Sequence, residues 1–148
     1  MFQRDETLGL IFPPVVNLGY PTLGHGWFTN LNPAKELAKK LGVKVPLDDA
    51  TPLAPLGSMF IARREALDIL VNAGFTWTDF PDEGGYHDGT LAHVVERFVA
   101  YAAAERGFRT ATVMSPEMAA ISHGFLEYRL QAVTHVLPGT TTDEIWLL

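Results

Sequence analysis

The stretch that decides the fold is DGTLAHVVERFVAYAAAERG, residues 88–107, which predicts one amphipathic helix. Spacings of three and four residues place its apolar side chains on one face: Leu91, Val94, Val95, Phe98 and Ala102. Either Asp88 or Thr90 can cap its start, and the helix is expected to last to Arg106, before Gly107. The same spacing puts three polar residues on the opposite face: His93, Glu96 and Arg97.

Three short apolar runs elsewhere in the chain predict strands, at residues 8–12 (LGLIF), 57–62 (GSMFIA) and 109–114 (RTATVM). The first is closed by Pro13 and Pro14, which cannot donate hydrogen bonds to a sheet. We expect the apolar face of the decisive helix to lie against the second run. Because these strands alternate with helices, the fold class expected is α/β, with a small sheet flanked by helices.

Three more helices are expected from start and stop signals. The first is capped by Asn32, has Pro33 at its first position, and stops at Gly42. The second covers residues 64–73 and follows the 57–62 strand directly. The third is long and covers residues 115–137, beginning with the Ser-Pro-Glu start pattern.

Composition and charge restrict the classes of function. A chain of 148 residues, 47% of them hydrophobic, can form one domain with a substantial core. The net charge of −6 argues against nucleic acid as a partner. The absence of cysteine excludes disulfides and thiolate chemistry, and it fits a reducing compartment. The first residues lack the pattern of a signal peptide, so a cytoplasmic protein is expected.

Three motifs in order carry a family resemblance: GSMFIARREAL at 57–67, TDFPDE at 78–83 and DGTLAHVVERF at 88–98. Together they resemble the signature of the rhamnan synthesis F protein family, glycosyltransferase-related proteins of bacterial cell-wall and surface polysaccharide assembly. LGLIFPP at 8–14 resembles the stretch that precedes this signature. The likeness therefore covers roughly residues 8–107.

The resemblance implies a longer enzyme with a GT-A-like fold, in which an earlier α/β half binds the nucleotide sugar, often with an Asp-x-Asp metal motif. That half is not visible, so residues 1–148 are expected to form a single domain, the C-terminal, acceptor-side portion of such a chain, inactive alone. The paired carboxylates Asp48 and Asp49 lie in a proline-rich connector, and we assign no metal site. Whether the longer enzyme uses a divalent metal stays open.

By the same resemblance, the enzyme would build a rhamnose-rich cell-wall or surface polysaccharide. Its partners would be a nucleotide sugar, a glycan acceptor and the missing N-terminal half. A lipid-linked acceptor would bring it to the inner face of the cell membrane as a peripheral protein. The alternative is a non-catalytic module that binds glycan or protein and retains the fold.

Asp88 is the candidate catalytic residue. Inverting sugar transfer needs a base to take the proton from the acceptor hydroxyl. Asp88 follows a Gly-Gly-containing turn and precedes Gly89 at a helix start, where a carboxylate can face a cleft. Its alternative role is plain helix capping, worth about 1 kcal/mol.

Eight further residues are candidates for binding the substrates: His93, Glu96, Arg97, Asp82, Glu83, Trp77, Tyr86 and Arg63. Arg97 and Arg63 could contact phosphate through charge-assisted hydrogen bonds. His93 could bind a sugar hydroxyl, with Glu96 orienting it or binding the acceptor. The alternative is that the three helix residues form a solvated face and pair locally.

The loop between the second and third motifs supplies the remaining candidates. Trp77 and Tyr86 could form a platform for a sugar ring, although large aromatic residues in loops also anchor the loop to the core. Asp82 and Glu83 could replace Asp88 as the base, or simply keep the loop in water.

Overall fold

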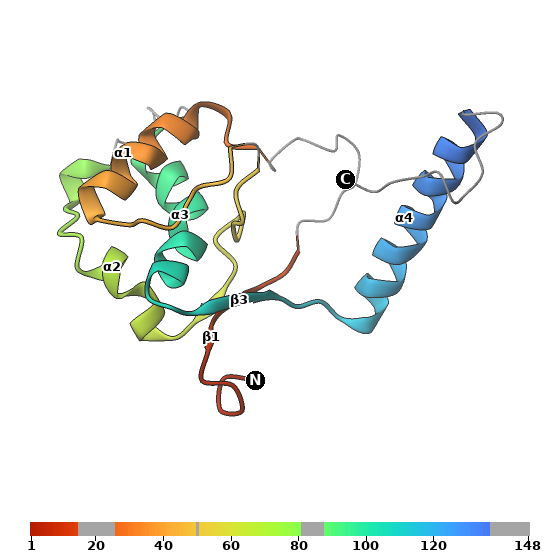
Figure 1. The fold of residues 1–148 in the computed structure, drawn as a ribbon, viewed down its shortest axis with the longest axis horizontal. Coiled ribbons are helices and arrows are strands. Elements are labelled where there is room, and N and C mark those ends of the chain that lie inside the picture. Colours follow the sequence, from red (N-terminus) through yellow and green to blue (C-terminus); the bar gives the residue numbers. More distant parts are fainter. Residues whose placement is uncertain (15–25, 50, 81–87, 137–148) are drawn as a thin grey trace. The chain divides into compact units, whose positions relative to one another are not determined.

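The computed structural model describes residues 1–14, 26–49, 51–80 and 88–136. In this part of the chain the fold class is α/β, as expected, with a three-stranded sheet and four α-helices (Figure 1). The chain divides into two compact units, Met1–Val113 and Met114–Leu148.

The sheet has β1 (Leu8–Phe12) in its centre, and every residue of this strand is buried. β2 (Ile61–Ala62) pairs with β1 antiparallel, and β3 (Arg109–Thr112) pairs with it in parallel. Gly9 stands where the register with β3 shifts. A Cβ at this position would lie 2.3 Å from that of Phe108, so only glycine allows this close approach. The predicted strand 8–12 is confirmed, and the strand expected at 109–114 ends at Thr112.

The segment 57–73 differs from its prediction. Gly57 and Ser58 both have positive φ, 81° and 56°, and the Ser58 amide donates to the Pro55 carbonyl at 2.8 Å. This turn prevents an extended start, which explains why β2 contains two residues instead of six. The expected helix 64–73 is a 3₁₀ turn, Arg64–Leu67, followed by one turn of α-helix, α2 (Asp68–Val71).

The first long helix, α1 (Leu31–Leu41), ends at Gly42 as predicted, with φ of 70° at that glycine. Its start is earlier than expected because a 3₁₀ turn, Phe28–Asn30, leads directly into it. Asn32 is therefore inside the first helical turn and is not the cap. Pro33 is tolerated there because the amides of the first turn have no partner within the helix.

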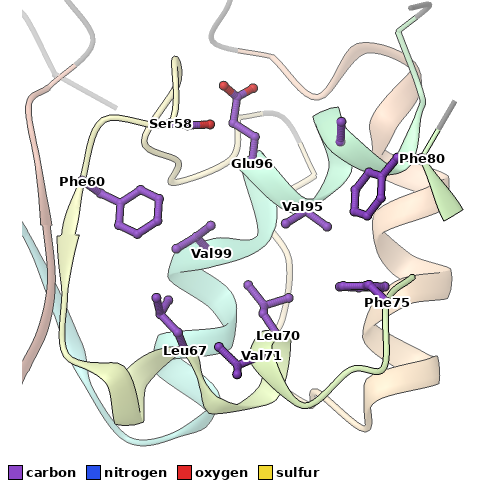
Figure 2. Close-up of a pocket in the computed structure, with 11 residues that line it drawn as sticks. Ser58, Phe60, Leu67, Leu70, Val71, Phe75, Phe80, Val95, Glu96 and Val99 are labelled. Atoms are coloured by element: carbon purple, nitrogen blue, oxygen red, sulfur yellow. The ribbon is translucent and has the colours of Figure 1, made fainter. Parts of the chain in front are cut away.

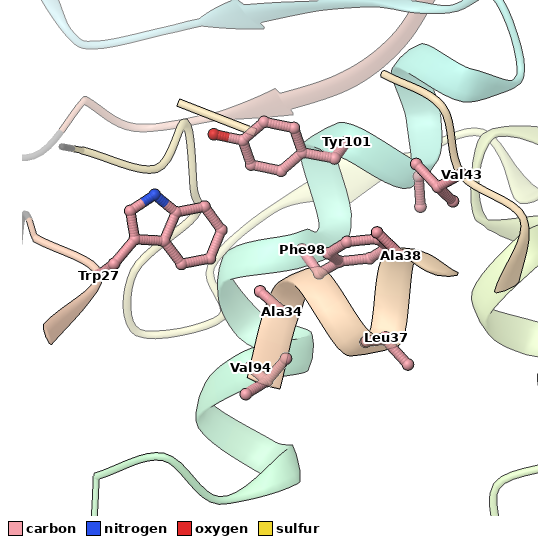
Figure 3. Packing of buried hydrophobic residues seen from close by; sticks show 9 residues of the cluster. Trp27, Ala34, Leu37, Ala38, Val43, Val94, Phe98 and Tyr101 are labelled. Atoms are coloured by element: carbon pink, nitrogen blue, oxygen red, sulfur yellow. The ribbon is translucent and has the colours of Figure 1, made fainter. Parts of the chain in front are cut away.

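The decisive helix, α3 (Leu91–Glu105), packs on two sides. One cluster joins Phe98, Val94 and Tyr101 to Trp27 and to α1 (Figure 3). The second joins α3 to β1 and to the 3₁₀ turn beside it through six buried residues: Leu10, Phe12, Ala66, Val99, Ala100 and Ala103. The predicted helix is thus confirmed, but Phe98 faces α1 instead of the 57–62 segment. Residues 97–103 of this helix are all buried, so a single apolar face could not show which neighbour it meets.

The second unit contains α4 (Pro116–Val136), a helix of 21 residues. The amide of Met118 donates to the Ser115 hydroxyl at 3.3 Å, which confirms the predicted start. Several of its apolar side chains are exposed: Met118, Ile121, Leu126 and Tyr128. No helix within the described ranges has both the length and the apolar character needed to span a bilayer.

Candidate functional site

A set of hydrogen bonds joins the start of α3 to the 3₁₀ turn that precedes α1. One oxygen of Asp88 accepts from the amide and the hydroxyl of Thr29, at 3.0 and 2.7 Å. Its other oxygen accepts from the side-chain amide of Asn30 at 2.5 Å. Asn30 in turn accepts from the Gly89 amide at 2.9 Å and donates to the Trp27 carbonyl at 2.9 Å. We call Thr29, Asn30, Asp88 and Gly89 the latch.

The latch exists because Asp88 is not the cap of α3. Thr90 takes the cap position with extended backbone, one of the two alternatives in the sequence. Gly89, between them, has φ of 94°, and a Cβ there would lie 3.1 Å from the Thr29 hydroxyl oxygen. Glycine is therefore required both for the turn and for the close approach. Asp88 is released from the helix, but its oxygens are used to hold Thr29 and Asn30.

The environment of Asp88 lowers its pKa. Partial burial raises the pKa, but the hydrogen bonds from Thr29 and Asn30 and the positive charge of Arg97 outweigh that effect. The group is ionised at neutral pH and is a weaker proton acceptor than an ordinary aspartate. Its catalytic role stays a prediction.

Arg97 is buried, with 7% of its side chain exposed, so of the alternative reading, a solvated face that pairs locally, only the local pairing holds for it. Its Nε donates to the Gly26 carbonyl at 3.4 Å and its Nη1 to the His93 carbonyl at 3.1 Å. Nη1 also lies 3.2 Å from the carboxylate of Glu96. The Gly26 carbonyl thus contacts this side of the helix, and nothing in the spacing of α3 itself could reveal that contact.

Glu96 and His93 are partly buried and also engaged. The second carboxylate oxygen of Glu96 accepts from the Gly57 amide at 2.7 Å, which fixes the turn before β2. The Nδ1 of His93 lies 3.0 Å from the Thr90 hydroxyl within the first turn of the helix. Each of the three predicted site residues of α3 therefore has a structural partner.

The remaining candidates lie elsewhere. Arg63 donates to the carbonyls of Leu8, Phe2 and Asp5, so it ties the N-terminal segment to the sheet. Trp77 is 85% exposed on a 3₁₀ turn, Trp77–Asp79. Three further candidates, Asp82, Glu83 and Tyr86, fall outside the described residues.

The turn that carries Trp77 is closed by a capping box, in which the Thr76 amide donates to the Asp79 carboxylate and the Asp79 amide donates to the Thr76 side chain. The amide and the hydroxyl of Thr76 both donate to the carboxylate of Asp79, at 2.6 and 2.7 Å. These hydrogen bonds lower the pKa of Asp79. The turn presents an exposed indole ring without using it for packing.

The aspartates of the proline-rich connector have structural contacts. The Asp48 carbonyl accepts from the indole nitrogen of Trp27 at 2.6 Å, and its carboxylate accepts from the Thr51 amide at 2.7 Å. Asp49 pairs with Lys35 at 2.9 Å. Among the described residues, no group of three or more carboxylates and histidines is placed to hold a metal ion.

An apolar pocket lies on the other side of α3, with a volume of about 350 Å³ (Figure 2). Its walls are the side chains of Phe60, Leu67, Leu70, Val71, Phe75, Phe80, Ala92, Val95 and Val99, and Ser58 and Glu96 complete it. Sequence reasoning missed the pocket, since a gap between elements leaves no periodic signal. It also missed Thr29 and Asn30, which are separated from Asp88 by almost 60 residues.

Comparison with known proteins places this small α/β domain in a family. The model described as Rhamnan synthesis protein F matches residues 1–108, and the chain belongs to that family. Relatives from two strains of Xanthomonas campestris pv. campestris, each named as an uncharacterized protein WxcX, are 42% identical over 112 residues. The alignment covers 76% of this chain and 15% of either relative, so the chain spans about 15% of their length. No solved structure matches it.

Proposed function

We propose that this chain is part of a glycosyltransferase that builds a rhamnose-rich cell-wall or surface polysaccharide from a nucleotide-sugar donor. The observation that carries the proposal is the family match over residues 1–108, which covers nearly the whole compact unit Met1–Val113. A unit that folds around its own core and belongs to a rhamnan synthesis family is best explained as a working part of that synthesis.

In this proposal the unit forms the acceptor-side half of a GT-A-like enzyme, and another part of the longer protein binds the donor. The partners are the nucleotide sugar, the glycan acceptor and that donor-binding part. A lipid-linked acceptor would hold the enzyme at the cytoplasmic face of the membrane. The small sheet with α3 against it, and α1 against α3, supports the α/β half. Trp77 offers an exposed ring on which a sugar can pack.

Asp88 is the proposed base. In the reaction, the acceptor hydroxyl gives its proton to the Asp88 carboxylate while its oxygen bonds to the anomeric carbon and the nucleoside diphosphate leaves. Among the described residues, Oδ1 of Asp88 accepts from Asn30 alone and so keeps a lone pair for the acceptor hydroxyl, whereas Oδ2 accepts from both the amide and the hydroxyl of Thr29. Variants at Asp88 and at Thr29 therefore separate the role of a base from that of the latch.

The test uses the full-length protein and measures transfer of labelled sugar from the nucleotide donor to the glycan, together with the melting temperature. Asp88→Asn should lower turnover at least about a hundredfold. Thr29→Val removes one latch donor but keeps the carboxylate, so its loss should stay below about tenfold. Asp49→Asn, at an exposed residue, is the control. Equal losses in the Asp88 and Thr29 variants would mean that Asp88 only holds the latch.

The second candidate function is a glycan-binding module without chemistry. It is favoured by the lowered pKa of Asp88, whose carboxylate already accepts three hydrogen bonds, and by Trp77, which is exposed on a turn closed by a capping box. In that case Trp77→Ala should weaken binding of a rhamnan oligosaccharide at least about fivefold by calorimetry, since one stacked aromatic ring contributes about 1 kcal/mol or more. Asp88→Asn would then leave sugar transfer by the full-length protein near normal.

A further inference from the structure

The pocket beside α3 has the dimensions of a ligand site. Its volume of about 350 Å³ lies within the range of about 300–1,000 Å³ found for small-molecule pockets. Figure 2 shows Val95 and Val99 on α3 facing Leu67 and Leu70, with Phe60 on one side. Phe75 and Phe80 close the other side. The body of the pocket is therefore lined by hydrocarbon and aromatic ring carbon.

The polar groups of the pocket are confined to one end. Ser58 and Glu96 lie together there in Figure 2, away from Leu67 and Val71. The Glu96 carboxylate is held in place by the Gly57 amide at 2.7 Å and by Arg97 at 3.2 Å. Two hydrogen bonds of this kind leave further lone pairs able to accept.

The backbone at this end is strained. Ser58 has φ of 56°, a conformation that residues other than glycine rarely adopt. The hydrogen bond from Gly57 to Glu96 keeps the turn in this shape and so places the Ser58 hydroxyl beside the carboxylate. Strain of this type persists where the surrounding structure fixes it, and it occurs often at ligand sites.

This distribution of groups defines the chemistry of the ligand. A sugar, with hydroxyls around its ring, would bury several of them against the apolar walls without partners, at a cost of about 1–3 kcal/mol each. An anionic head would lie against the Glu96 carboxylate in a chain whose net charge is −6. We propose that the pocket binds an uncharged amphiphile, with its hydrocarbon body along α3 and a hydroxyl head donating to Glu96. This site is separate from the proposed sugar-transfer role of Asp88.

The pocket can be tested by nuclear magnetic resonance on the isotope-labelled 148-residue chain, with 1-octanol as the probe. We expect saturable shifts of the amide signals of Leu70, Val95 and Val99. Sodium octanoate, which has a similar body and a negative head at neutral pH, should bind at least tenfold more weakly. Glu96→Gln removes the charge and keeps an acceptor, so it should reduce that difference to less than about threefold.

A substitution that fills the pocket can be compared with the same substitution outside it. Val95→Trp should weaken octanol binding at least tenfold, while Leu53→Trp, at an exposed position outside the pocket, should leave it unchanged. If Val95→Trp does not fold, the comparison of alcohol with carboxylate on the unaltered chain decides alone. Three results would overturn the proposal: no saturable shifts, octanoate binding as tightly as octanol, or pocket signals that shift with protein concentration, which would show that a second copy covers the pocket.

Discussion

The two sides of α3 differ in how completely they are filled. On the side of α1, the latch and Arg97 satisfy their polar groups within the chain, and Phe98 is fully buried. On the other side, Val95 and Val99 line a pocket that the described residues leave open. The polar residues most prominent in the sequence are thus largely used to hold segments together. The space for a ligand is instead lined by apolar residues, such as Val95 and Val99, that in the sequence look like ordinary core residues.

The largest expected effect comes from replacing Phe98, on the side of α3 that packs against α1. Phe98→Ala should lower the free energy of unfolding by about 3–5 kcal/mol, because the ring is fully buried between α1 and Trp27. Denaturant unfolding measures the loss. Val71→Ala, at a residue 61% exposed on the pocket side, is the control and should cost far less. A loss below about 1 kcal/mol at Phe98 would contradict the packing of α3 on α1.

The latch should come next. Asn30→Ala leaves the Gly89 amide and one Asp88 oxygen without their partner, at an expected cost of about 1–3 kcal/mol. A double-mutant cycle with Asp88→Ala should show coupling, with the double variant losing less than the sum of the single variants by about 0.5 kcal/mol or more. Strict additivity would mean that the two residues act independently.

Acid should weaken the latch, whereas the packing of the apolar side chain of Val99 should not depend on pH. The pKa of Asp88 is lowered in the folded protein, so its stabilisation is present above the unfolded value of about 3.9 and is lost as pH falls through the folded value. The stability difference between the unaltered chain and Asp88→Ala should therefore shrink below about pH 4. The pKa of Asp5 is lowered to about 2 by Thr7 and Arg109, so Asp5 also makes stability depend on pH. Asp5→Asn is therefore introduced into both proteins to remove this second source of pH dependence. The cost of Val99→Ala should not change over the same range.

The smallest expected effect is at Trp77. Trp77→Ala should change the free energy of unfolding by less than about 0.5 kcal/mol, since the ring is 85% exposed and the turn is closed by Thr76 and Asp79. Thermal melting is the measurement. A loss above about 1 kcal/mol would show that the ring anchors the turn to the pocket wall.

The parts of the fold that could be predicted are those that depend on local sequence. The apolar run 8–12 ended at its prolines, and Gly42 stopped α1 as expected. Local spacing also gave the bounds of α3 to within a residue or two. Gly57 and Ser58 show where this reasoning failed, because two successive positive φ angles changed an apolar run into a turn.

The site was predicted less well because its contacts are distant in sequence. Spacing placed Glu96 and Arg97 on one side of a helix, but it could not show that Gly26 covers Arg97 or that Gly57 binds Glu96. The cap of α3 was left between Asp88 and Thr90, and only the partner Thr29 explains why Asp88 is not used for it.

The pairing of β1 with β3 has a consequence for synthesis of the chain. Leu8 and Leu10 align with Arg109 and Thr110, so the central strand acquires its parallel neighbour only after roughly a hundred further residues are made. At about 5–20 residues per second, this leaves an apolar strand incompletely paired for about 5–20 s on the ribosome. Nascent chains of this protein should therefore be clients of ribosome-associated chaperones until Thr112 has left the exit tunnel.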